Sequence, residues 1–176
     1  MLFILIFALV LLDQITKHLV ANSLTLGQDI SVIDGFFDIT YERNTGSAFS
    51  FLADENWGIY ILAAISVIAS VLLLFFQIKY RKKLPFLLRL DLAVLTAGTI
   101  GNMIDRTVYR SVVDFLKFTF GTYVFPIFNV ADICVVVATI GLMLLVLKKQ
   151  EYFFGEKNSS SKKETEISSG DIEETP

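Results

Sequence analysis

The sequence is poor in the residues that disulfide, zinc and thiol chemistry require. It has one cysteine, Cys134, and one histidine, His18, so it can form no internal disulfide and offers no cysteine–histidine zinc cluster. It also lacks a P-loop, a glycine-rich dinucleotide motif and the G-x-S-x-G of serine hydrolases. We therefore expect neither a metal nor a cofactor. Cys134 lies in an apolar run, where we expect a small buried side chain.

Charge is absent or scarce over four long stretches. The chain is 54% hydrophobic, and its mean hydropathy of +0.62 is too high for an ordinary soluble domain. A helix crosses a membrane with about 20 mostly apolar residues, and segments of roughly this length occur at 1–22, 57–78, 87–106 and 127–147. No basic residue precedes the first segment and no small-residue cleavage site follows it, so we expect a retained span rather than a signal peptide. The sequence predicts an all-α integral membrane protein with four transmembrane helices.

The basic residues predict how the chain crosses the membrane. Five Lys or Arg lie in segment 79–89, and Lys148 and Lys149 follow the fourth apolar segment. The positive-inside rule then places loop 79–89 and both termini in the cytoplasm, with loops 23–56 and 107–126 outside. A basic patch after a span indicates topology, so we expect no nucleic-acid binding.

The chain is expected to divide into a membrane domain and a tail. Residues 1–152 would form the four-helix domain. Residues 153–176 are rich in Ser, Glu, Lys and Thr and have no apolar period, which is typical of a disordered segment. We expect this tail to be cytoplasmic and assign it no role.

The first outer loop carries signals for a small β-element. Asp34-Gly35 is a hairpin signal, and the flanking segments alternate between apolar and polar residues. We expect this extracytoplasmic element to lie against the membrane. Further along, Gly46 allows a tight turn and Asn44 can both donate and accept hydrogen bonds. The run 48–51 contains two phenylalanines and could cover a nearby site.

The first apolar segment contains one opposite-charge pair. Asp13 and Lys17 are four residues apart, so they share a helix face and can pair. Two interpretations remain open from the residues alone. The pair either neutralises itself so that the helix tolerates the membrane, or it orients a polar site from the neighbouring helix.

Three aspartates are predicted to meet at the outer membrane boundary. Asp105 ends the third span, Asp114 lies in the short loop that follows, and Asp132 lies about one and a half turns into the fourth span. Asn129 shares a helix face with Asp132 near a helix N-terminus, where the dipole favours an anion. A carboxylate at the centre of a membrane helix costs roughly 2.5 kcal/mol or more, so three of them point to a chemical role.

Two adjacent carboxylates have a known use in hydrolysis. Like charges a few ångströms apart share one proton. The ionised partner can then take a proton from water while the protonated partner polarises a carbonyl group. The alternatives are a proton or cation relay in a small transporter subunit, or a structural four-helix scaffold. Spacing alone leaves all three open.

Four sequence blocks resemble those of one known family. They are DQITK at 13–17, RNTGSAFS at 43–50, GNMIDR and VVDF within 101–115, and FNVAD at 128–132. In this order, over about residues 5–150, they resemble the bacterial lipoprotein signal peptidases (signal peptidase II).

The resemblance implies an aspartic endopeptidase in the bacterial cell membrane. Such enzymes cut prolipoproteins at the extracytoplasmic face, on the amino side of a diacylglyceryl-modified cysteine. It further implies contact with membrane lipid and inhibition by globomycin-type cyclic peptides. The aspartates of VVDF and FNVAD, Asp114 and Asp132, would form the catalytic pair. Asp105 is the rival, but Arg106 beside it offers a neutralising partner. The supporting and substrate-binding residues would be Asp13, Lys17, Asn44, Gly46, Asn102, Asp105, Arg106 and Asn129.

Overall fold

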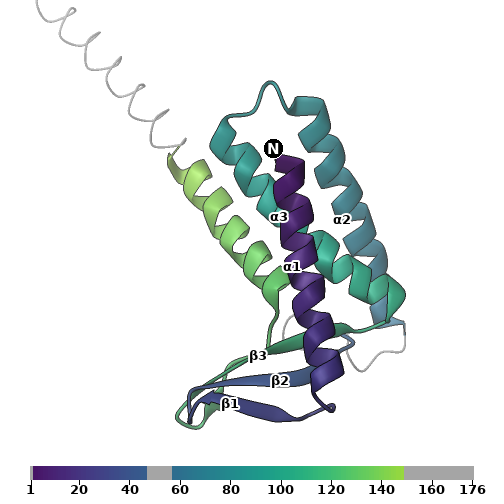
Figure 1. Ribbon diagram of the computed structural model, residues 1–176. Helices are drawn as coiled ribbons and strands as arrows, with labels where there is room; N and C mark the ends of the chain where they lie inside the picture. The colour runs from purple at the N-terminus through teal and green to yellow at the C-terminus, as the bar shows by residue number, and fades with distance from the viewer. Residues whose placement is uncertain (1, 47–56, 149–176) are drawn as a thin grey trace, which may run out of the picture. The chain divides into compact units, whose positions relative to one another are not determined.

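The computed structural model describes residues 2–46 and 57–148 (Figure 1). The expected cover at 48–51 and the expected disordered tail 153–176 lie outside these residues. The chain divides into two units after Thr139, and of the second unit only Ile140–Lys148, the end of a helix, is described. The sheet and the polar clusters near the helix ends all belong to the first unit.

Four helices in the described part of the chain are long and apolar enough to cross a membrane, as predicted. They are α1 (Leu2–Ser23), α2 (Gly58–Tyr80), α3 (Phe86–Val108) and an unlabelled helix, Val130–Lys148, that we call the fourth helix. Large apolar side chains are exposed along them, as expected of helices that face lipid. The architecture is that of a multi-pass membrane protein.

The start of the fourth helix differs from the prediction. We expected the fourth span to begin at Ile127, but the helix begins at Val130. Residue Phe128 instead pairs with Leu116 in an isolated β-bridge, which holds the chain extended up to Asn129. This later start moves Asp132 from the second turn of the helix into the first.

Small residues allow the helices to approach one another closely. A Cβ added at Gly101 would lie 2.5 Å from the Asp13 carboxylate, and one added at Gly98 would collide with the backbone of Ala131. Ala97 is also almost fully buried. The small residues of α3 therefore permit close packing, and α3 is the most buried of the described helices.

The strands between α1 and α2 and those between α3 and the fourth helix form one antiparallel sheet. Its strands are β1 (Asp29–Ile33), β2 (Phe37–Asn44), β3 (Val112–Phe120) and β4 (Tyr123–Val124), in the order β1-β2-β3-β4. The predicted hairpin at Asp34-Gly35 is confirmed, and Gly35 has the positive φ of 71° that this turn requires.

The second outer loop was predicted wrongly. We expected residues 107–126 to form a loop, but nine of them form β3, which pairs with β2 in the registers Glu42↔Asp114 and Asn44↔Val112. Asp114 therefore lies on a strand, in the middle of a sheet, rather than in a connecting loop. This pairing brings Asn44 and Asp114 together although 70 residues separate them.

The sheet is fixed to the helices by a small apolar core. Leu24, Tyr41, Val113 and Phe115 are buried together, with Val130 at the start of the fourth helix packed against them. This core joins the end of α1, both central strands and the fourth helix. It holds β3 and the fourth helix, which carry Asp114 and Asp132, against the same support.

Candidate active site

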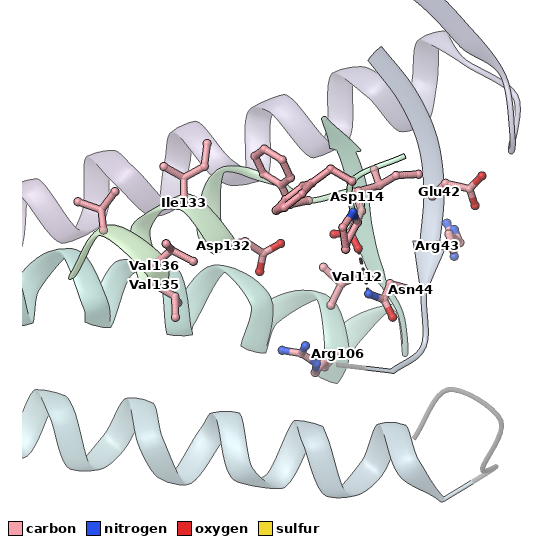
Figure 2. A pocket seen from close by; sticks show the side chains of 15 residues that line it. Glu42, Arg43, Asn44, Arg106, Val112, Asp114, Asp132, Ile133, Val135 and Val136 are labelled. Carbon is pink, nitrogen blue, oxygen red and sulfur yellow. Dashed lines mark hydrogen bonds between the residues drawn. The ribbon is translucent and has the colours of Figure 1, made fainter. Parts of the chain in front are cut away.

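A cavity of about 720 Å³ opens between β2, β3, the end of α3 and the first turns of the fourth helix (Figure 2). Asp114 and Asp132 both line it. Most of the remaining wall is apolar. The lining residues are Glu42, Arg43, Asn44, Arg106, Val112, Asp114, Phe125, Pro126, Ile127, Phe128, Asp132, Ile133, Val135, Val136 and Val137.

Asp132 belongs to a reciprocal cap at the start of the fourth helix. The backbone N–H of Asp132 donates to Asn129 Oδ1 at 3.0 Å, and the backbone N–H of Asn129 donates to Asp132 Oδ2 at 3.1 Å. This is the capping-box arrangement, which satisfies N–H groups that have no partner within a helix. The cap leaves Asp132 Oδ1 to accept a 2.8 Å bond from Asn102 Nδ2.

Asp114 is buried on β3 and is held by two amides. Its Oδ1 accepts a 2.6 Å bond from Asn129 Nδ2, and its Oδ2 accepts a 3.0 Å bond from Asn44 Nδ2. Burial and, secondly, the nearby Asp132 carboxylate raise the pKa of Asp114 from 3.8 to about 6. Its amide partners oppose that shift but do not cancel it.

A buried ion cluster lies behind this pair. Lys17 Nζ contacts Asp13 Oδ2 at 2.8 Å and Asp105 Oδ2 at 2.9 Å, and it donates to Asn102 Oδ1 at 3.0 Å. The predicted pairing of Asp13 with Lys17 is thus confirmed. Asp13 Oδ1 also accepts the backbone N–H of Ala131 at 2.8 Å, so α1 supplies a further cap to the fourth helix.

Arg106 does not play the part expected of it. We predicted that it would neutralise Asp105, but Asp105 pairs with Lys17 instead. Adjacent residues of a helix point in different directions, and Arg106 lines the cavity while Asp105 faces the ion cluster. Arg106 Nη1 forms a long hydrogen bond, 3.4 Å, to Ser66 Oγ on α2.

Sequence reasoning missed Gln14. Its Nε2 donates to Asp105 Oδ1 at 3.0 Å and to the Gly101 carbonyl at 3.2 Å, which joins α1 to α3 beside the ion cluster. A polar amide within an apolar helix, next to Asp13, was the available signal. Ser66 on α2, the partner of Arg106, carried no such signal.

All ten residues singled out from the sequence lie at or behind the cavity. Asp114, Asp132, Asn44 and Arg106 line it. Asn102, Asn129, Asp13, Lys17 and Asp105 form the hydrogen-bonded layer behind it. Gly46 contributes through its backbone, whose N–H donates to Asn44 Oδ1 at 2.9 Å.

The carboxylates of the site suit proton transfer. Within residues 2–46 and 57–148, no group of three or more His, Cys, Asp or Glu side chains is arranged to hold a metal ion. Cys134 is buried, as expected. What the cavity presents is one buried aspartate and one half-buried aspartate, and such a pair can take up and release one shared proton.

These features define a class, the multi-pass membrane proteins with a carboxylate pair in a cavity at the helix ends. Comparison with known proteins identifies the family. A family model described as Signal peptidase (SPase) II matches residues 5–148. The chain therefore belongs to the signal peptidase II family.

Individual relatives agree with this assignment. The lipoprotein signal peptidase of Bacillus pumilus (strain SAFR-032) is 41% identical over 145 residues, which cover 82% of this chain and 91% of that protein. The lipoprotein signal peptidase of Symbiobacterium thermophilum is 45% identical over 138 residues, covering 78% and 88%. A solved structure described as a bacterial membrane enzyme, by the in meso method at 2.3 Å, is 30% identical with a TM-score of 0.75, covering 85% of this chain and 88% of that chain.

Proposed function

We propose that this chain is an aspartic endopeptidase in which Asp114 and Asp132 form the catalytic pair. Membership of the signal peptidase II family means that it removes signal peptides from prolipoproteins. The aspartic mechanism and the residues that carry it are the parts we propose.

One observation carries the assignment of the pair. Asp114 and Asp132 line the same cavity, and the hydrogen bonds described above reach them from neutral amide and backbone N–H groups. Neither forms an ion pair in the described part of the chain. The rival Asp105 is paired with Lys17 at 2.9 Å and does not line the cavity. An ammonium partner favours the ionised form of a carboxylate over a shared proton.

The pair would act by general acid–base catalysis. One carboxylate is ionised and removes a proton from a water molecule, whose oxygen attacks the carbonyl carbon of the scissile peptide. The protonated carboxyl gives its proton to the carbonyl oxygen, which forms a neutral gem-diol. The intermediate then collapses: the protonated carboxyl gives its proton to the nitrogen, the ionised carboxylate takes a proton from one hydroxyl, and the C–N bond breaks to release the amine and a carboxylic acid. The proton belongs to the pair, so neither residue is assigned as the base.

The cavity walls fit the proposed substrate. The apolar wall contributed by Phe125, Phe128, Ile133 and Val136 borders the carboxylates. It can accept an apolar signal segment or an acyl chain while the peptide bond reaches the polar end. This supports cleavage on the amino side of a diacylglyceryl-modified cysteine, as the family resemblance implies.

The membrane orientation is also part of the proposal. The basic loop 79–89 supports a cytoplasmic location for that loop and for both termini. The sheet and the cavity would then lie at the extracytoplasmic face of the bacterial cell membrane. A globomycin-type cyclic peptide would inhibit by occupying this cavity.

The test is cleavage of a diacylglyceryl-modified precursor by purified full-length protein. Asp114→Asn and Asp132→Asn should each lower the rate by about 10²–10⁴-fold or more, because each removes one half of the acid–base pair. The cyclic peptide should block the parent, and a chelator should not. Thermal unfolding of each variant checks that the protein remains folded.

Two further aspartate variants serve as controls. Asp38→Asn alters a carboxylate on β2 that lies 3.8 Å from Lys117, outside the cavity, and should cleave at the parental rate. Asp105→Asn should cleave more slowly but measurably. Near-normal cleavage by Asp114→Asn together with an inactive Asp105→Asn would move the pair to Asp105 and Asp132.

A further inference from the structure

Three asparagines surround the carboxylate pair in one common arrangement. In Asn44, Asn102 and Asn129 the side-chain oxygen accepts a hydrogen bond from an N–H donor, and the side-chain nitrogen donates to Asp114 or Asp132. An amide can present either its oxygen or its nitrogen to a neighbour. Whatever fixes the oxygen therefore decides what the carboxylate meets.

Two of these amides are fixed by the backbone. Asn44 Oδ1 accepts the Gly46 N–H at 2.9 Å, and Asn129 Oδ1 accepts the Asp132 N–H at 3.0 Å. A backbone N–H can only donate, so the nitrogen of each amide must point the other way. Both nitrogens reach Asp114, at 3.0 Å and 2.6 Å.

The third amide is fixed by a side chain. Asn102 Oδ1 accepts a 3.0 Å bond from Lys17 Nζ, and Asn102 Nδ2 donates to Asp132 Oδ1 at 2.8 Å. An ammonium group has three donors and no acceptor, so it admits only the oxygen of Asn102. Asn129 Nδ2, at 3.3 Å, is a second donor to the same oxygen.

We propose that Lys17 is a positioning residue of the catalytic pair, whose ammonium holds the Asn102 amide in the orientation that donates to Asp132. The inference rests on the proposed function of Asp114 and Asp132. Lys17 does not line the cavity, so it acts on the reaction through Asn102. Among the three anchors, Lys17 is the one that a side-chain substitution removes.

The consequence is a change in the proton affinity of the pair. Without Lys17, only the 3.3 Å bond from Asn129 Nδ2 still holds the Asn102 oxygen, so the amide can turn that oxygen toward Asp132 more easily. A hydrogen bond to the ionised carboxylate is then lost, and a positive charge is lost behind it. Both effects favour the protonated forms. The pair should release its protons at higher pH, which shifts the whole rate–pH profile to higher pH.

Other charged groups also face Lys17 and the carboxylate pair. Lys17 faces Asp13 on its own helix and Asp105 on α3. The pair faces Arg106 from α3 and Glu42 from β2, both on the cavity wall. A variant that removes Lys17 alone also changes the net charge of the ion cluster. A second variant that keeps this net charge is therefore needed.

The experiment compares rate–pH profiles for cleavage of the modified precursor. The first variant is Lys17→Met, which removes the charge and the donor. The second is Lys17→Met/Asp13→Asn, which keeps the net charge of the cluster and leaves an amide oxygen at position 13 that can still accept the Ala131 N–H. Lys79→Met, an exposed lysine near the end of α2, is the matched control.

In Lys17→Met, both limbs of the rate–pH profile should move to higher pH by about one unit. In the charge-balanced double variant the shift should be about half as large, since only the orientation effect remains. Lys79→Met should leave the profile in place. If Lys17→Met does not yield folded protein, the double variant decides.

Two results would overturn the inference. One is a double variant whose rate falls while both limbs coincide with those of the parent, which is the behaviour of a merely structural lysine. The other is a shift in Lys17→Met that vanishes in the double variant, which indicates charge alone. Failure of the proposed function looks different, because Asp114→Asn or Asp132→Asn would then still cleave.

Discussion

Two pairs of aspartates lie on either side of Asn102, and they differ in the charge of their partners. Asp13 and Asp105 share the ammonium of Lys17 at 2.8 and 2.9 Å. Asp114 and Asp132 are bonded to amides and backbone N–H groups. The same residue type is therefore paired with a cation in the first pair and with neutral groups in the second, which suits the proton exchange that we propose for the second pair. Asp114 is buried, as both members of the first pair are. For Asp114, the difference from the first pair therefore lies in the charge of the bonded groups and not in burial.

The largest expected effect comes from removing the cation of the first pair. Lys17→Met leaves two buried carboxylates without a counter-charge, and breaking such a buried ion pair costs about 3–5 kcal/mol of unfolding free energy. Asp114→Asn should not destabilise the protein comparably, because it removes a carboxyl whose ionised form is disfavoured by burial. Equilibrium unfolding in detergent measures both. Equal stability losses would erase the distinction between the pairs.

The second pair should make stability depend on pH. The pKa of Asp114 is raised to about 6 in the folded protein, above its ordinary 3.8. Between these values the folded state keeps a proton that the unfolded chain releases. Stability should therefore fall as pH rises from about 4 to about 6, by up to roughly 3 kcal/mol.

Asp114→Asn should remove that part of the pH dependence, as thermal unfolding at pH 4.5 and pH 7 would reveal. Cleavage by the parent should also fall as pH rises past the value at which the pair loses its shared proton. An Asp114→Asn variant with the parental slope of stability against pH would show that Asp114 titrates normally.

The smallest effect is expected at the surface. Lys117 pairs with Asp29 across the sheet, and this contact lowers the pKa of Asp29 and raises the pKa of Lys117. Both side chains remain in contact with water, and exposed ion pairs are worth about 0–1 kcal/mol. Lys117→Met should thus change the unfolding free energy by less than about 1 kcal/mol, measured beside Lys17→Met. A comparable loss in both variants would mean that burial does not set the strength of these pairs.

Much of the helical architecture could be predicted because it depends on hydropathy, which is a local property. The strand β3 could not be predicted with the same ease. Its run VVDFLKFTF contains Asp114 and Lys117, and its pairing with β2 joins segments about 70 residues apart. The late start of the fourth helix was missed because the apolar run already begins at Ile127, whereas the Asn129 side chain, which forms the cap, sets the actual start.

The candidate site divides in a similar way. The pairing of Asp13 with Lys17 follows from their spacing of four residues, and the structure confirms it. Arg106 was assigned to Asp105 because they are adjacent in sequence, yet neighbours on a helix diverge. The true partner, Lys17, comes from another helix, and no periodicity reveals such a contact. The roles of the residues in cleavage remain predictions.

The capping of the fourth helix has a practical consequence for capturing a complex with bound precursor. Asp132 holds the first turn of its helix in place through the Asn129 N–H. Replacing Asp132 is therefore expected to loosen the helix end that forms part of the cavity wall. Asp114 projects from a paired strand and contacts this helix end only through the Asn129 side chain. Under the proposed function, an inactive form intended to retain its uncut ligand is therefore better made at Asp114.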